Sequence, residues 1–147
     1  MLQRFIRDKN NHKTLGKSID LQEPINLVKH RAFLKLPFEE DHMKQDAIAV
    51  NLQRAAEQVL DLANHVIKQK KLGLPKESKE SFDILFRAGV IPGELAEKLK
   101  GMVGFRNVLV HQYEDLDLKI MVDVIEHRLG DLVDFTDYVL KYMHGAP

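Results

Sequence analysis

Residues 43–71 read MKQDAIAVNLQRAAEQVLDLANHVIKQKK, and this stretch decides the fold that we predict for the chain. Its apolar residues recur at steps of three and four, which places them on one face of an α-helix; they are Ile48, Leu52, Ala55, Ala56, Val59, Leu62, Ala63 and Val66. Strong helix formers dominate, and neither glycine nor proline interrupts the stretch. Lysines at its end suit the negative pole of the helix dipole, and Gly73 and Pro75 follow as stop signals. We therefore predict one long amphipathic helix here.

Three later segments show the same helical spacing of apolar residues. The first covers 78–87, with Ser78 as its predicted N-cap and a glycine two residues after its end. The second covers 92–106 and has proline in its first turn, and the third covers 117–143 with Asp117 as its N-cap. No stretch alternates with period two, so we expect no sheet. The pattern predicts an all-α protein, an up-and-down helical bundle of four to six helices.

The first 41 residues carry weaker signals. Pro24 can open a helix at its first turn and Pro37 should end it, so a short helix is predicted near 24–36. Basic residues outnumber acidic ones in this segment, which is typical of a solvated tail. We divide the chain into a poorly readable N-terminal extension over 1–41 and a helical domain over 42–147.

Size and composition exclude several classes of protein. At 147 residues the chain is one domain by length, and without cysteine it has neither disulfides nor a thiolate metal site. Lys and Arg number 22 and Asp and Glu 22, so net charge gives no reason to expect nucleic-acid binding, which would need a local patch. No apolar run approaches the roughly 20 residues of a membrane span, and the N-terminus has no signal-peptide core. We expect a soluble, cytoplasmic protein with no membrane partner.

The stretch GFRNVLVHQY over 104–113 lies where the helical pattern gives way to an acidic turn, and it holds Arg106, His111 and Tyr113. On an undistorted helix, five steps from Arg106 to His111 give a net rotation of about 140°, so the two side chains point apart. They can serve one substrate only if the helix loosens between them or if a second chain supplies the facing half. Seven steps from Arg106 to Tyr113 return to within about 20°.

These residue types suit chemistry on a phosphodiester. Arg106 offers a planar fork of donors that fits phosphate oxygens, and the imidazole of His111 can accept and return a proton at cellular pH. Together they could cleave RNA without a metal, because the ribose 2′-hydroxyl supplies the nucleophile and the guanidinium stabilises charge on phosphorus. Asn107 is a poor interior helix residue and could orient its neighbours.

Plainer interpretations stand beside this one. An Arg and a His near a helix end are often a surface pair or a C-terminal cap. His111 with Glu114, Asp115 and Asp117 could form a metal cluster, but the spacing fits no established metal motif and the acids suit a turn and an N-cap. We therefore expect no metal and no cofactor.

Two further groups of charged residues have alternative readings. Lys68, Lys70 and Lys71 could contact RNA phosphates, or they could form an ordinary solvated helix end. Arg54 and Glu57 lie three residues apart on the long helix, which is typical of an exposed ion pair; a dimer contact is the alternative.

The stretch 104–113 resembles the Arg-x-x-x-x-His-x-Tyr signature of the HepT-like branch of HEPN domains. The preceding residues 95–103 match that branch as well, as do 46–57 and 61–65 of the long helix. The likeness covers about 44–143 and includes the order of the helices, whereas the first forty residues match poorly.

HepT-like proteins are all-helical, homodimeric toxins of toxin–antitoxin pairs and act as metal-independent endoribonucleases. The resemblance implies that Arg106 and His111 are catalytic, with Asn107 as a supporting residue, in a composite site at the dimer interface. It also implies an MNT-type minimal nucleotidyltransferase antitoxin that transfers AMP from ATP to Tyr113. The alternative is a non-catalytic helical partner that binds a nucleotidyltransferase and helps to present nucleotide or substrate.

Overall fold

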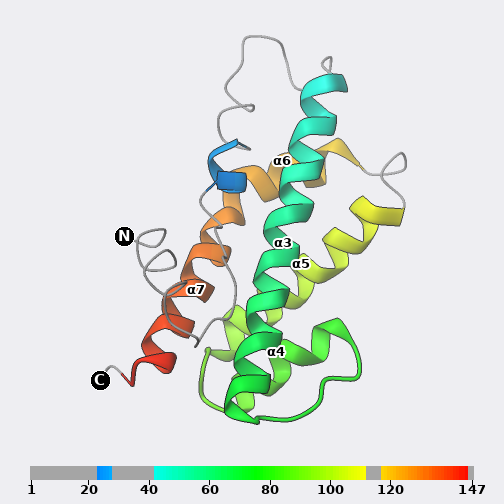
Figure 1. Ribbon diagram of the computed structural model, residues 1–147. Helices are drawn as coiled ribbons and strands as arrows, with labels where there is room; N and C mark the ends of the chain where they lie inside the picture. The colour runs from blue at the N-terminus through cyan, green and yellow to red at the C-terminus, as the bar shows by residue number, and fades with distance from the viewer. Residues whose placement is uncertain (1–22, 28–41, 112–116, 146–147) are drawn as a thin grey trace.

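The computed structural model describes residues 23–27, 42–111 and 117–145, and every regular element in these residues is a helix (Figure 1). The elements are a short helix over 23–27, α3 (His42–Lys70), α4 (Ser78–Arg87), α5 (Gly93–His111), α6 (Leu118–His127) and α7 (Leu129–Met143). The all-α bundle predicted from the sequence is confirmed. Within the described residues, none of the helices combines the length and apolar composition that a membrane span requires.

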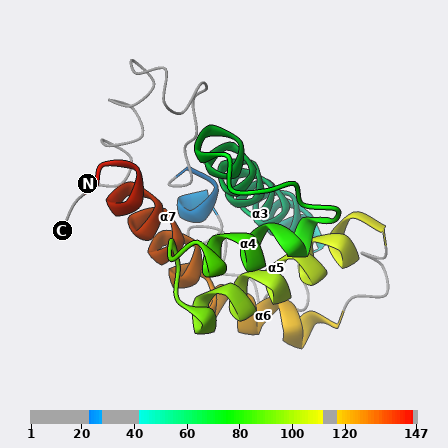
Figure 2. The same ribbon diagram turned by 90° about the horizontal axis from the view of Figure 1, so that it is seen from below.

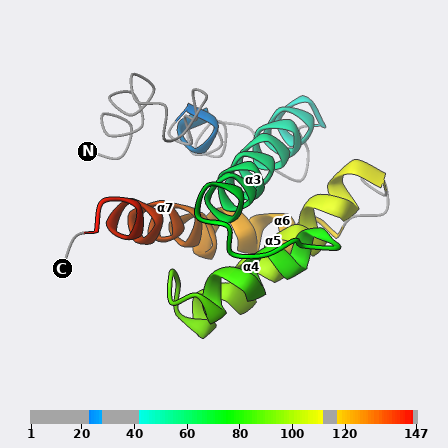
Figure 3. The same ribbon diagram turned by 60° about the horizontal axis from the view of Figure 1, so that its bottom comes forward.

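Helix α3 is the centre of the bundle, and its observed bounds differ by one residue at each end from the predicted 43–71. It packs against α4, α5 and α7, while α5 also packs against α4 and α7. Figures 2 and 3 show α4 and α5 lying side by side next to α3, and α7 packs against both α3 and α5. All eight apolar positions of the predicted stripe are buried, so hydrophobic burial explains why this helix forms the core.

A Schellman motif ends α3, and the residue that makes it differs from the predicted stop signal. The Leu72 N–H donates to the Ile67 carbonyl at 2.9 Å and the Lys71 N–H donates to the Lys68 carbonyl at 3.3 Å. Lys71 takes the left-handed position with φ 54°, although glycine usually occupies it. Gly73, at φ 151°, lies beyond the motif and shapes the following loop.

The bounds of α4 match the predicted 78–87 but its N-cap differs, and α5 begins one residue later than predicted. Glu77 is the N-cap of α4, and Ser78 is its first helical residue, so the predicted serine cap is wrong. Pro92 precedes α5, and its carbonyl accepts from the Ala96 N–H at 3.0 Å. Gly89 closes α4 as predicted, with φ 79°.

The predicted single helix over 117–143 is broken in two at Arg128. Val124 and Leu129 are both buried, but five residues of a straight helix would turn them about 140° apart. The interruption lets both segments face the core, and Gly130 lowers the helix propensity just beyond it. Asp117 is the N-cap of α6 as predicted, because its carboxylate accepts from the Lys119 N–H at 2.8 Å.

The short helix over 23–27 lies in the region where the sequence predicts a helix over 24–36. Its Ile25 is 1% exposed and belongs to the same apolar core as α3. The remainder of that predicted helix lies outside the described residues.

Two contacts fasten α4 to its neighbours. The rings of Phe82 and Phe135 meet edge to face with centroids 5.8 Å apart, which joins α4 to α7. The hydroxyl of Ser81, which is completely buried, donates to Oδ1 of Asn64 on α3 at 2.6 Å.

Replacing Asn64 with alanine should therefore destabilise the protein more than replacing Ser81. Asn64→Ala leaves the buried Ser81 hydroxyl without this acceptor, for which we expect a loss of about 1–3 kcal/mol in the free energy of unfolding. Ser81→Ala leaves the exposed Asn64 amide to water and should cost less. Urea unfolding of both variants and of the double variant measures the difference; equal costs for the two single variants would contradict the expectation.

Candidate functional site

Helix α5 carries Arg106 and His111 and runs without interruption through His111. The helix therefore does not loosen between the two residues, which separates them by about 140° around the axis and about 7.5 Å along it. Within one chain the guanidinium and the imidazole point to different sides of α5. Of the two arrangements that the sequence left open, the structure does not show the one in which the helix loosens between the two residues.

Arg106 lies against α3 and is partly buried, with 26% of its side chain exposed. Its Nε is 3.7 Å from Oε1 of Glu57, and that same carboxylate oxygen accepts from Nε2 of Gln53 at 3.2 Å. Its Nη1 donates to Oδ1 of Asn107 at 2.7 Å. The guanidinium is thus held between a carboxylate on α3 and an amide on its own helix.

His111 is the last residue of α5 and is exposed to solvent. Asn107, one turn earlier, is exposed as well, so these two side chains occupy neighbouring positions on the outer side of α5. Tyr113 lies outside the described residues, as do Glu114 and Asp115 of the alternative metal cluster. The fourth member of that cluster, Asp117, uses its carboxylate to cap α6.

Lys68, Lys70 and Lys71 are exposed at the end of α3 that lies beside α4 (Figure 1). Eleven residues separate Lys68 from Glu57, which corresponds to about 16 Å along the helix. The structure therefore does not bring these lysines to Arg106. A shallow hollow of about 600 Å³ lies beside Lys68 and Lys71 and is otherwise lined mainly by Ile67, Leu74 and Pro75.

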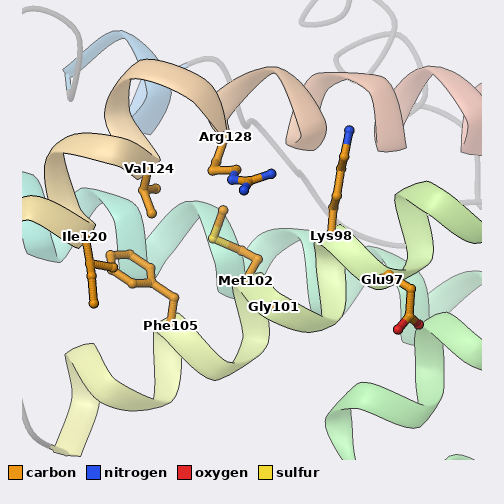
Figure 4. Close-up of a pocket in the computed structure, with 8 residues that line it drawn as sticks. All are labelled: Glu97, Lys98, Gly101, Met102, Phe105, Ile120, Val124 and Arg128. Carbon is orange, nitrogen blue, oxygen red and sulfur yellow. The ribbon is translucent and has the colours of Figure 1, made fainter.

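A second cavity, of about 420 Å³, lies between α5 and α6 and contains none of the motif residues. Figure 4 shows Met102 and Phe105 of α5 pointing toward Val124 and Ile120 of α6, with Arg128 above them. The cavity is mostly apolar, and its charged residues lie toward one end.

Groups with shifted pKa values lie on other parts of the surface. Hydrogen bonds to Asp83 and Glu97, each at 3.0 Å, raise the pKa of the Lys100 ammonium. Burial raises the pKa of Asp131 on α7, and the nearby cations Lys98 and Arg128 oppose that shift.

Glu57 is a site residue to which the sequence pattern assigned a different partner. Arg54, its predicted ion-pair partner, instead donates to Oδ1 of Asn51 at 3.3 Å, while the Glu57 carboxylate faces Arg106. A contact between α3 and α5 cannot be deduced from spacing along one helix. The available signal was an acidic residue at the edge of an otherwise apolar stripe.

The sequence is similar to those of known ribonucleases. A family profile described as Ribonuclease HepT-like matches residues 22–139. The mRNA nuclease HepT of Shewanella oneidensis is 42% identical over 102 residues, which cover 69% of this chain and 77% of that protein.

Two solved structures share the arrangement of helices. A toxin–antitoxin crystal structure with AMP-PNP has a TM-score of 0.78 at 34% identity, covering 92% of this chain and 97% of that one. The tri-AMPylated Shewanella oneidensis HEPN toxin in complex with MNT antitoxin has a TM-score of 0.77 at 37% identity, covering 81% and 90%.

The fold and the motif on α5 together define an all-helical domain of HEPN type. The chain belongs to the HepT-like ribonuclease family.

Proposed function

We propose that this protein is a metal-independent endoribonuclease toxin of a toxin–antitoxin pair and acts in the cytoplasm as a homodimer. Arg106 and His111 are its catalytic residues, and Asn107 supports Arg106 through their hydrogen bond at 2.7 Å. The site is composite, with the guanidinium of one protomer and the imidazole of the other at one RNA phosphate.

One observation supports the proposal above all: Arg106 and His111 of the family motif lie on an unbroken helix, and their side chains point in different directions. A rotation of about 140° separates Arg106 from His111, so one chain cannot direct both at the same phosphorus. A twofold axis near the end of α5 repeats each group and brings the Arg of one copy toward the His of the other. Because His111 is exposed at the helix end, the imidazole is accessible to such a partner.

The chemistry needs only these side chains and the substrate. The ribose 2′-oxygen attacks the adjacent phosphorus while the bond from phosphorus to the 5′-oxygen breaks, which leaves a cyclic phosphate and a free 5′-hydroxyl. His111 takes the proton of the 2′-hydroxyl and gives a proton to the leaving 5′-oxygen, so the imidazole ends the reaction in the protonation state in which it began. Arg106 stabilises the negative charge that grows on the phosphate oxygens. DNA lacks the internal nucleophile and is not cleaved by this route.

Neutralisation by a nucleotidyltransferase partner completes the proposed function. One similar structure holds a tri-AMPylated HEPN toxin with MNT antitoxin, and another toxin–antitoxin structure holds AMP-PNP. By analogy, an MNT-type antitoxin transfers AMP from ATP to Tyr113 of this chain. The added phosphates place negative charge two residues after His111 and repel RNA.

The lysines at the end of α3 are proposed as outlying contacts with the RNA backbone. The distance along α3 from Glu57, which faces Arg106, to Lys68, Lys70 and Lys71 is about 16 Å or more. These lysines would therefore hold flanking nucleotides rather than the scissile phosphate.

A mixed dimer tests the shared site. Arg106→Ala and His111→Ala chains carrying different affinity tags are co-expressed, and the dimer that carries both tags is isolated. In a composite site, one of its two sites pairs an intact Arg with an intact His, so we expect about half of the wild-type activity on RNA in chelator. Each variant alone should be nearly inactive.

Doubly tagged wild-type dimer is the control for the tags and the isolation. If each site used Arg106 and His111 of the same chain, every site in the mixed dimer would lack one of the two catalytic residues. The mixed dimer would then be as inactive as each variant alone. If wild-type protein itself left RNA intact, the non-catalytic role as a nucleotidyltransferase partner would replace the nuclease.

A further inference from the structure

One atom of the catalytic arginine has no hydrogen bond among the described residues. Nε of Arg106 is buried from solvent and lacks a hydrogen-bond partner there. A phosphate cannot reach an atom that water does not reach, so this N–H is not the donor that binds the substrate. A buried donor without a partner is unfavourable, and the protein must supply a compensating group.

The nearby carboxylate on α3 is that group. Oε1 of Glu57 lies 3.7 Å from Nε, which is within ion-pair range but longer than a good N–H···O hydrogen bond. Gln53, one turn earlier on α3, donates its amide to the same oxygen at 3.2 Å and thereby fixes the carboxylate. Nη1 of the same guanidinium donates a hydrogen bond to Oδ1 of Asn107.

We infer that Glu57 is a positioning residue that orients the guanidinium of Arg106 for the substrate phosphate; this inference rests on the proposed nuclease function. With Nε directed at Glu57 and one proton of Nη1 at Asn107, Nη2 has no contact of this kind among the described residues and is the nitrogen left to bind phosphate oxygens. The planar guanidinium cannot turn without breaking one of these contacts. The Glu57 side chain is 42% exposed, so water screens its charge from an approaching phosphate.

Steady-state kinetics on an RNA oligonucleotide in chelator test this role with Glu57→Ala and Glu57→Gln. Misplacing a catalytic group can cost about 100-fold, so we expect Glu57→Ala to lower kcat by about 10- to 100-fold while KM changes by less than about threefold. Glu57→Gln should retain more activity, because its amide oxygen can still face the Nε–H. Melting temperatures close to wild type show that the variants are folded.

A second background separates positioning from general damage. In Arg106→Lys protein there is no planar fork to orient, so adding Glu57→Ala should change the residual kcat by less than about twofold. Glu126→Ala, which removes an exposed carboxylate from a different ion pair, is the matched control and should retain wild-type kinetics. Wild-type kcat in Glu57→Ala, or the same loss in the wild-type and Arg106→Lys backgrounds, would overturn the inference.

Solvent exchange of the Arg106 Nε–H, followed by NMR, gives a readout that does not depend on RNA cleavage. We expect slow exchange in wild-type protein and at least about tenfold faster exchange in Glu57→Ala, because the side chain is then free to turn toward water. Unchanged exchange would refute the positioning contact even if the protein is a nuclease. Absence of RNA cleavage by the wild type, with exchange changed as expected, would refute the nuclease function alone.

Discussion

Arg106→Ala and His111→Ala proteins should each cleave RNA about 10²- to 10⁴-fold more slowly than wild-type protein in the presence of chelator. His111 moves a proton in the transition state, a contribution that is typically worth about 10²- to 10⁴-fold. Arg106 stabilises the developing charge on phosphorus, and losing one such donor typically costs about 10²- to 10³-fold. Neither residue belongs to the apolar core, so stability should change little.

The measurement is the rate of cleavage of a labelled RNA at saturating enzyme, in parallel with thermal unfolding. His127→Ala and Arg87→Ala are matched controls, because both side chains are exposed on other helices. Both controls should retain wild-type rates. Cleavage at the wild-type rate by His111→Ala would mean that the activity comes from elsewhere on the protein or from a contaminant. Loss of activity on adding chelator would contradict the metal-independent mechanism.

Tyr113→Phe should abolish AMP transfer by the partner nucleotidyltransferase. Phenylalanine keeps the ring but lacks the phenolic oxygen that would attack the α-phosphorus of ATP and displace pyrophosphate. Intact-mass measurement after incubation with partner and ATP should show added AMP units on wild-type protein and none on the variant. The variant should also remain an active nuclease in the presence of partner and ATP, since no phosphate charge is added beside the site.

The sequence contains three tyrosines, which provides the control. Tyr138→Phe and Tyr142→Phe change the two on α7 and should accept AMP as wild type does. AMP addition that persists in Tyr113→Phe would remove Tyr113 from its proposed role. If wild-type protein accepted AMP but still cleaved RNA at its unmodified rate, modification of the protein would not be what neutralises it.

The bounds of α3 and α4 could be predicted to within one residue, whereas α5 continues five residues past the predicted end at 106. Helix α3 was predictable because its apolar residues repeat without interruption and nothing else competes for them. The same reasoning failed at Arg128. The apolar residues of 117–143 were read as one helical face, but Val124 and Leu129 would point in different directions on a single straight helix, and the chain forms two helices there. The end of α3 was predicted to within one residue, but the residue that closes it was not, since Lys71 adopts the left-handed conformation normally associated with glycine.

The candidate site was predictable only in part. The spacing of Arg106, His111 and Tyr113 indicated both the chemistry and the divergence of the first two side chains, and the unbroken α5 shows that this divergence is real. The contact of Arg106 with Glu57 was not predictable, because it joins residues that are 49 positions apart on two helices.

Sequence by itself determined the helical class of this protein and the motif residues, because periodic burial and side-chain chemistry are local properties that the order of residues records directly. Only the tertiary structure decided which carboxylate faces the guanidinium, where the last helix breaks, and that Arg106 and His111 diverge on a rigid element. Those outcomes depend on how separate helices pack against one another. Packing balances burial, charge and steric fit over the whole bundle, and no single stretch of residues contains that balance.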